Sequence, residues 1–257
     1  MKQIKLYLKE MQRAVSPKTF FKKTSETTNG KGKTMKRILA IFLVVIMCVS
    51  LTACGGKKKK AFEASKAAYD NINTAYEISE QFSEDIYEAW RLGIYDKDKL
   101  IENGIKYLDA ELHLSESELE QGLIYSYAEG LGKDVSELSE TEKSNLINYQ
   151  SVVFTTAKSE MFSFCVHMVR GAYTVNGKIE EIQAALDQAK AQMKELSDKF
   201  SDYEHYPSLK GFYTTTSALF DFCQNPEGSF EQVIQTINNY RNEARDYMND
   251  LKYIFEG

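Results

Sequence analysis

The segment 178–203, KIEEIQAALDQAKAQMKELSDKFSDY, decides the fold class. Its apolar residues follow one another at alternating steps of three and four positions, which places them on one face of an α-helix. They are Ile179, Ile182, Leu186, Ala189, Met193, Leu196, Phe200 and Tyr203. A continuous seam of this kind packs against neighbouring helices at a small angle. The segment therefore predicts one long helix of a left-handed, near-antiparallel bundle.

The rest of the chain after Lys60 shows the same helical periodicity. Only two prolines occur there, Pro207 and Pro226, and no sustained alternation of apolar and polar residues indicates a strand. Helical patterns cover about 61–92, 101–127, 139–176, 207–223 and 230–256. Gly93 and the acidic turn after it are expected to end the first helix, and Pro207 is expected to open a short one.

Three capping boxes, in which a serine is followed three residues later by Glu or Gln, mark helix starts. They are Ser115 with Glu118, Ser139 with Glu142, and Ser229 with Gln232. The helix that begins after Ser139 is the most apolar of them, which predicts a place in the middle of the bundle. The pair Asn176-Gly177 indicates its end. The apolar stripe keeps its phase across this pair, so one bent continuous helix is the alternative.

These patterns together predict an all-α domain over residues 61–257. We expect an elongated antiparallel helical bundle of about four long helices plus one broken and one short helix, after an N-terminal signal segment. About 200 residues are enough to bury a core of their own. No linker rich in Gly, Pro or Ser divides this region, which argues for one domain.

The stretch 35–54, MKRILAIFLVVIMCVSLTAC, has the layout of a secretory signal. Two charges precede an uncharged apolar run from Ile38 to Val49, and small residues follow. Its last four residues resemble the lipobox of bacterial lipoproteins: Leu51, Thr52, Ala53 and Cys54. The resemblance implies that 35–53 is removed as a signal peptide and that the Cys54 thiol takes a diacylglyceryl group. The mature chain is then anchored in the cell membrane by lipid and faces outside the cytoplasm.

An uncleaved membrane anchor is the rival interpretation, because no charge intervenes from Ile38 to Gly56. We favour cleavage, since a cysteine and two glycines end that run and are poor spanning residues. Residues 1–34 carry nine Lys or Arg and are either sequence upstream of a true start at Met35 or a long basic leader. Residues 54–60 form a lysine-rich tether, which either sits at lipid headgroups or is a solvated spacer.

From Cys54 onward the chain holds 21 Lys and Arg against 35 Asp and Glu, a net charge near −14. Binding to nucleic acid depends on neutralising phosphates with Lys and Arg. A domain this acidic is therefore not expected to bind nucleic acid. An acidic domain is also expected to stand away from an anionic membrane surface, apart from its lysine run.

Residues that carry chemistry are sparse. Three scattered histidines offer no pair of metal ligands, and neither a nucleophile motif nor a glycine-rich nucleotide turn is present, so we expect no enzyme, metal or cofactor. The polar and aromatic knot Tyr203, His205 and Tyr206 is the one candidate ligand site. Cys165 and Cys223 are allowed to form a disulfide outside the cytoplasm, although buried free thiols are the alternative.

Two functions fit these features. The first is a lipid-anchored structural or interaction module at the cell envelope, which presents a helical face to a protein partner or to its own copy. The second is an extracytoplasmic sensor or binding module for a small ligand. A sensor is expected to have polar and aromatic side chains gathered between its helices, whereas an interaction module is expected to expose a continuous apolar patch.

Overall fold

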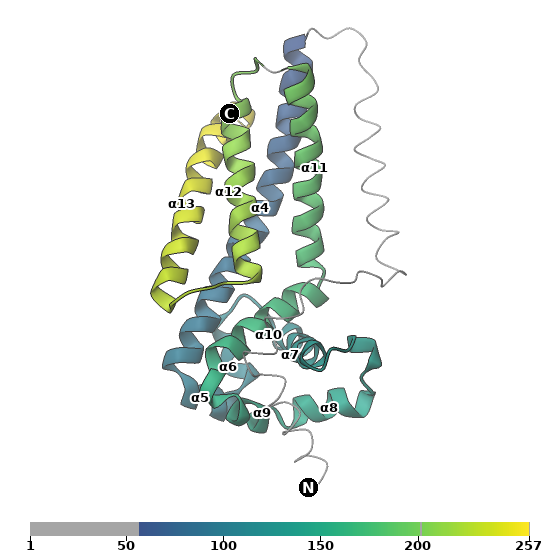
Figure 1. Ribbon diagram of the computed structural model, residues 1–257, viewed down its shortest axis with the longest axis vertical. Helices are drawn as coiled ribbons and strands as arrows, with labels where there is room; N and C mark the ends of the chain where they lie inside the picture. Colours follow the sequence, from purple (N-terminus) through teal and green to yellow (C-terminus); the bar gives the residue numbers. More distant parts are fainter. Residues whose placement is uncertain (1–56, 201, 257) are drawn as a thin grey trace.

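In a computed structural model of the protein, residues 57–200 and 202–256 are described, and they form helices without a strand (Figure 1). The all-α prediction is confirmed. The α-helices are α4 Lys57–Tyr95, α5 Lys97–Asn103, α6 Ile105–Glu111, α7 Glu116–Gly130, α8 Glu140–Asn148, α9 Gln150–Thr156, α10 Met161–Val175, α11 Lys178–Lys199, α12 Tyr206–Gln224 and α13 Phe230–Phe255, with short 3-10 helices η1 Val135–Glu137 and η2 Lys158–Glu160. The proposed signal segment and Cys54 lie outside the described residues.

Helix α4 runs the length of the molecule and organises the rest (Figure 1). Helices α11, α12 and α13 pack against it, α13 from Phe62 as far as Tyr87, and the four helices form an antiparallel bundle. The seam predicted for 178–203 faces inward in α11, where Ile182, Leu186 and Leu196 are buried. On α13 the seam residues Val233 and Ile237 are buried in the same way. Local periodicity therefore predicted the packing faces correctly.

The shorter helices α5 to α10 pack around the second half of α4 and form what we call the lobe (Figure 1). Helix α10 is its centre and contacts both α4 and α7. Trp90 of α4 stacks on Phe162 of α10, with ring centroids 5.3 Å apart. The buried side chains of the bundle and of the lobe form one continuous hydrophobic core along α4.

The single long helix predicted for 139–176 is wrong, because this segment is broken at Tyr149 and again at Ala157. The first break lets the Gln150 side chain accept the main-chain N–H of Ile105 at 2.8 Å. Before the second break, the threonines at 155 and 156 bond back to carbonyls four residues earlier, a contact that bends helices. The fourth member of the bundle is therefore α12, which the sequence predicted only as a short helix.

Helices α7 and α10 cross at a very short distance, made by two glycines. A Cβ on Gly122 would lie 2.2 Å from the main-chain oxygen of Met168, and one on Gly171 would lie 2.7 Å from the oxygen of Gly122. Gly93 makes a similar close contact, because a Cβ on it would lie 2.3 Å from the Cα of Phe162. Gly93 itself therefore does not end the helix: α4 continues to Tyr95 and ends at the acidic turn that begins with Asp96, and this glycine admits a neighbouring backbone.

Three kinds of predicted boundary agree with the structure, whereas the helix predicted for 178–203 ends earlier, at Lys199. Gly177 has a φ of 74° and separates α10 from α11, so the break at Asn176-Gly177 is confirmed over the continuous alternative. Pro207 lies in the first turn of α12. All three capping boxes are formed at the starts of α7, α8 and α13, with the serine side chain accepting the third N–H of its helix. Local backbone geometry at Gly177 and Pro207, and local hydrogen bonds at the three serines, explain these helix ends.

Candidate functional site

The predicted knot lies at the end of the bundle where α4 begins and α13 ends: Tyr203 and His205 are in the turn between α11 and α12, and Tyr206 is the first residue of α12. The rings of Tyr203 and His205 meet edge to face, with centroids 5.3 Å apart, and His205 meets Phe255 of α13 in the same way at 6.4 Å. Tyr206 packs against the core instead. The Nε2 atom of His205 lies 3.5 Å from a carboxylate oxygen of Glu204.

The ring contacts continue from this turn into the bundle. Phe255 also contacts Phe62 and Tyr69 of α4, at 5.5 and 5.3 Å between ring centroids. The Tyr69 hydroxyl donates to Glu256 at 3.0 Å, and burial together with this carboxylate raises the pKa of Tyr69. These contacts tie the first turns of α4 to the last turn of α13. The knot is thus part of an aromatic plug that closes the end of the bundle, and packing explains the position of its rings.

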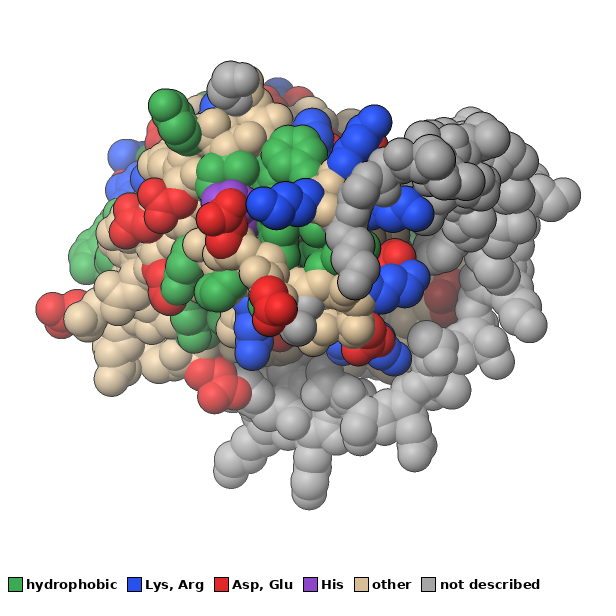
Figure 2. Space-filling model, turned by 90° about the horizontal axis from the view of Figure 1, so that it is seen from above, with side chains coloured by type: hydrophobic (Ala, Val, Ile, Leu, Met, Phe, Trp, Pro, Cys, Tyr) green, Lys and Arg blue, Asp and Glu red, His purple; other side chains and the backbone are tan. Residues whose placement is uncertain are grey.

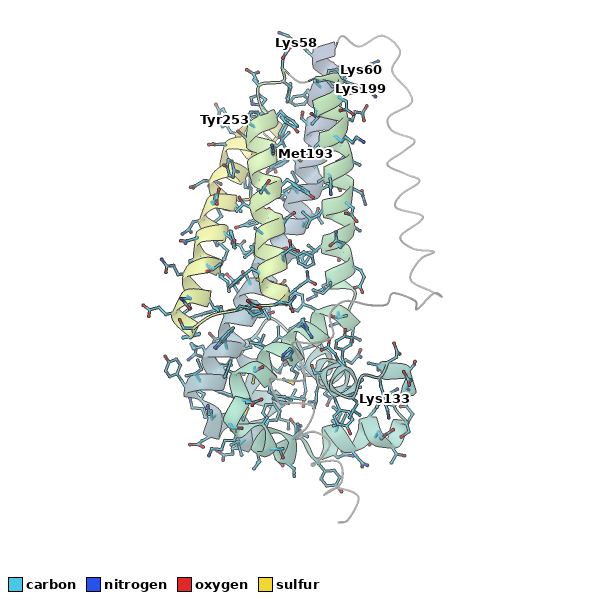
Figure 3. The ribbon with its side chains drawn as sticks, viewed as in Figure 1. Lys58, Lys60, Lys133, Met193, Lys199 and Tyr253 are labelled. Carbon is cyan, nitrogen blue, oxygen red and sulfur yellow. The ribbon has the colours of Figure 1, made fainter. Side chains whose placement is uncertain are left out.

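The outer surface of this plug is apolar at its centre. Figure 2 looks onto it and shows hydrophobic side chains gathered among lysine, arginine and acidic ones. Tyr253 is the most exposed large hydrophobic residue described, at 85%, and Phe62 is 39% exposed. Lys58 and Lys60 at the start of α4, and Lys199 at the end of α11, lie at the same end (Figure 3).

A buried carboxylate that sequence reasoning missed lies where the bundle meets the lobe. Asp85 of α4 is 1% exposed and accepts three hydrogen bonds. The Tyr173 hydroxyl of α10 donates at 2.8 Å, and the main-chain N–H of His113 donates at 2.9 Å to the other oxygen, which also lies 3.0 Å from His113 Nδ1. Burial and the neighbouring carboxylate raise the pKa of Tyr173. This cluster joins α4, α10 and the α6–α7 connection.

The place of Asp85 in the sequence is itself a signal for this site. Asp85 lies between Phe82 and Ile86, on the buried side of α4, where a charged residue is costly unless it is hydrogen-bonded. Its partners are 28 and 88 residues away in the sequence, so no local pattern identifies them. The ring of Tyr173 also packs on Phe82 at 4.4 Å, and the Lys178 ammonium lies 4.8 Å from its centroid.

A second polar cluster ties α4 to α13. Glu80 accepts from Arg245 Nε and from the Tyr76 hydroxyl, each at 2.9 Å, and lies 3.4 Å from Arg241. Arg241 also pairs with Glu84. Burial and Glu80 raise the pKa of Tyr76. These charges pair with one another between α4 and α13, which indicates a role in joining the two helices.

The remaining candidate residues, the cysteines and His167, lie in the packed interior. Cys165 and Cys223 are both free and buried, which is the alternative to the disulfide. Burial raises the pKa of the Cys165 thiol to about 12. His167 lies on the apolar helix α10, and burial, with Arg170 nearby, lowers its pKa to about 3. Within the described part of the chain, no three His, Cys, Asp or Glu residues are grouped so that they hold a metal ion.

Comparisons with known proteins give no family. No protein family model matches the chain, and no curated protein or solved structure is significantly similar to it. None of the helices between residues 57 and 256 combines the length and apolar character needed to cross a membrane.

Proposed function

We propose that the protein is a bacterial lipoprotein, anchored in the cell membrane through an acylated Cys54 and facing outside the cytoplasm. Its acidic helical domain serves there as a structural or protein-interaction module. The observation that carries this proposal is a juxtaposition: the lipobox residues Leu51 to Cys54 are followed at once by a folded domain whose first helix begins at Lys57. Only Gly55 and Gly56 lie in the sequence between the attachment point and the first helix.

The shape of the domain supports a presenting role. A helix rises 1.5 Å per residue, so the 39 residues of α4 span roughly 60 Å. The lobe packs on the second half of α4, so it lies at the end away from Lys57 and from Cys54 before it. A partner that meets the lobe would meet an acidic surface, since residues 96–176 hold 7 Lys and Arg against 14 Asp and Glu. We therefore expect a partner with a basic face.

The anchor is tested by expressing the full chain in a bacterium and measuring the intact mass of the membrane-extracted protein. We expect a chain that begins at Cys54 and carries added lipid, while Cys54→Ala keeps the upstream residues and carries none. A wild-type chain that begins before residue 54 without lipid would overturn the proposal.

The module is tested on the same anchored chain by thermal melting with a panel of metabolites. Light scattering measures its oligomeric state alongside. A small ligand at a hundredfold its dissociation constant adds about 2.7 kcal/mol of stability and raises the melting temperature. We expect no such shift. A reproducible shift from one compound would replace the interaction module by the sensor described above.

A further inference from the structure

We propose that the aromatic plug at the start of α4 is a membrane-contact face, which rests on the lipid headgroups so that the bundle stands upright and the lobe points away. This inference rests on the proposed function, since it takes Cys54 as the point of lipid attachment. It adds a surface and an orientation, neither of which follows from attachment alone.

The short tether brings this end of the bundle to the membrane. Three peptide units separate Cys54 from Lys57, and a fully extended chain advances at most about 3.6 Å per residue, so they reach about 11 Å. The ends of α11 and α13 and the start of α12 lie beside the start of α4 (Figure 1). All four helix ends are therefore held close to the attachment point, whichever way the domain leans.

Surface chemistry decides between an upright and a flat domain. Lys58, Lys59 and Lys60 are exposed at this end, and anionic headgroups attract lysines placed beside an anchor. Residues 57–60 carry four of the positive charges, so the remainder of the described chain has a net charge near −18. A flat domain would lay that acidic flank against an anionic surface, which is unfavourable.

The exposed aromatic residues agree with an upright domain. Tyr253 projects from the last turn of α13 at this end (Figure 3), and tyrosine is enriched where a membrane meets water because its ring is apolar and its hydroxyl is polar. Phe62 adds an apolar edge one turn into α4. Acidic residues are present too, among them Glu256, but it accepts from Tyr69 and lies 3.8 Å from Lys252.

The test places an environment-sensitive fluorophore at either end of the anchored chain. Tyr253→Cys puts the label on the plug, and Tyr95→Cys is the matched control on the lobe, since Tyr95 is 67% exposed. The native thiols do not compete, because Cys54 is consumed by lipid and the other two, Cys165 and Cys223, are buried. The lipidated chain is reconstituted in vesicles of phosphatidylcholine and phosphatidylglycerol with spin-labelled headgroups.

We expect a blue shift and strong quenching at position 253, and neither at position 95. Replacing Lys58, Lys59 and Lys60 by glutamine should lower the quenching at 253 while the chain stays on the vesicles. Equal quenching at both positions shows a flat domain and overturns the orientation. No quenching at either position shows that the plug does not touch the membrane, which overturns the contact face as well. Intact mass separates these outcomes from failure of the anchor, because an unlipidated chain overturns the proposed function itself.

Discussion

The buried carboxylate of Asp85 gives the sharpest prediction, because it joins the bundle to the lobe through contacts that mutations can separate. We expect Asp85→Ala to destabilise the protein strongly. Hydrogen bonds to a charged group contribute about 1.5–3 kcal/mol each, and a buried hydroxyl left without a partner costs about 1–3 kcal/mol. The side chain of His113 is 55% exposed, so water can replace its lost partner. The loss at Tyr173, which is fully buried, therefore dominates.

Together these terms lower the free energy of unfolding by about 3 kcal/mol, because removal of the desolvated carboxylate offsets part of the loss. For a domain of this size, the melting temperature falls by roughly 2–4 °C per kcal/mol, so we expect a drop of roughly 6–12 °C. Tyr173→Phe removes only one donor and should cost about 1–2 kcal/mol. The double variant should lose less than the sum of the two single losses, by about 1–2 kcal/mol.

Urea unfolding, followed by the fluorescence of Trp90, measures these free energies. Trp90 is the only tryptophan of the chain and is stacked at the contact between α4 and α10, so it reports on this joint. Asp85→Asn is the control, because it keeps the shape and one acceptor oxygen. A coupling energy near zero in the double-mutant cycle, or an Asp85→Ala variant as stable as the native protein, would refute the reasoning.

Three further predictions concern packing, pH and reactivity. Gly122→Ala should cost about 1–3 kcal/mol in urea unfolding, because its Cβ would overlap the backbone of α10, whereas Ala at the exposed Gln121 should change little. The pKa of His167 is lowered to about 3 in the folded chain, so at acidic pH the unfolded chain binds a proton that the folded chain does not bind. The free energy of unfolding should therefore fall by about 2 kcal/mol between pH 7 and 5, and by less in His167→Gln. Thiol reagents at pH 8 should leave Cys165 and Cys223 unmodified until denaturant is added, by mass spectrometry, and rapid native labelling would contradict their burial.

The parts of the fold that were predictable from the sequence depend on contacts within one helix. The seam of α11 and the three capping boxes involve residues three or four positions apart, so the pattern and its cause lie in the same short segment. The breaks at Tyr149 and Ala157 have a different origin. A bond between Gln150 and the distant Ile105 stabilises one of them, and apolar periodicity does not register such a bond.

The candidate sites show the same division. Tyr203 and His205 are neighbours in the sequence and in space, so their cluster was found, although the contact of the two rings and that of His205 with Phe255 show packing rather than a ligand pocket. Asp85 was overlooked because an isolated charged residue on a helix is usually solvated. Only its position within the buried stripe of α4 marks it as unusual, and its partner Tyr173 comes from a segment whose fold was predicted wrongly.

The continuity of α4 determines how the two ends of the molecule affect each other. One uninterrupted helix carries Tyr69 in the plug, Glu80 in the bundle and Asp85 at the lobe, and its core residues are buried along the whole distance. A domain held at one end by lipid can present its far end at a fixed height only if no hinge lies between, and α4 has neither a proline nor a break between Lys57 and Tyr95. The hydrogen bonds of Asp85 then fix the lobe to α4. A proline introduced in the middle of α4 should therefore release the lobe from its fixed distance while leaving the label at position 253 at the membrane.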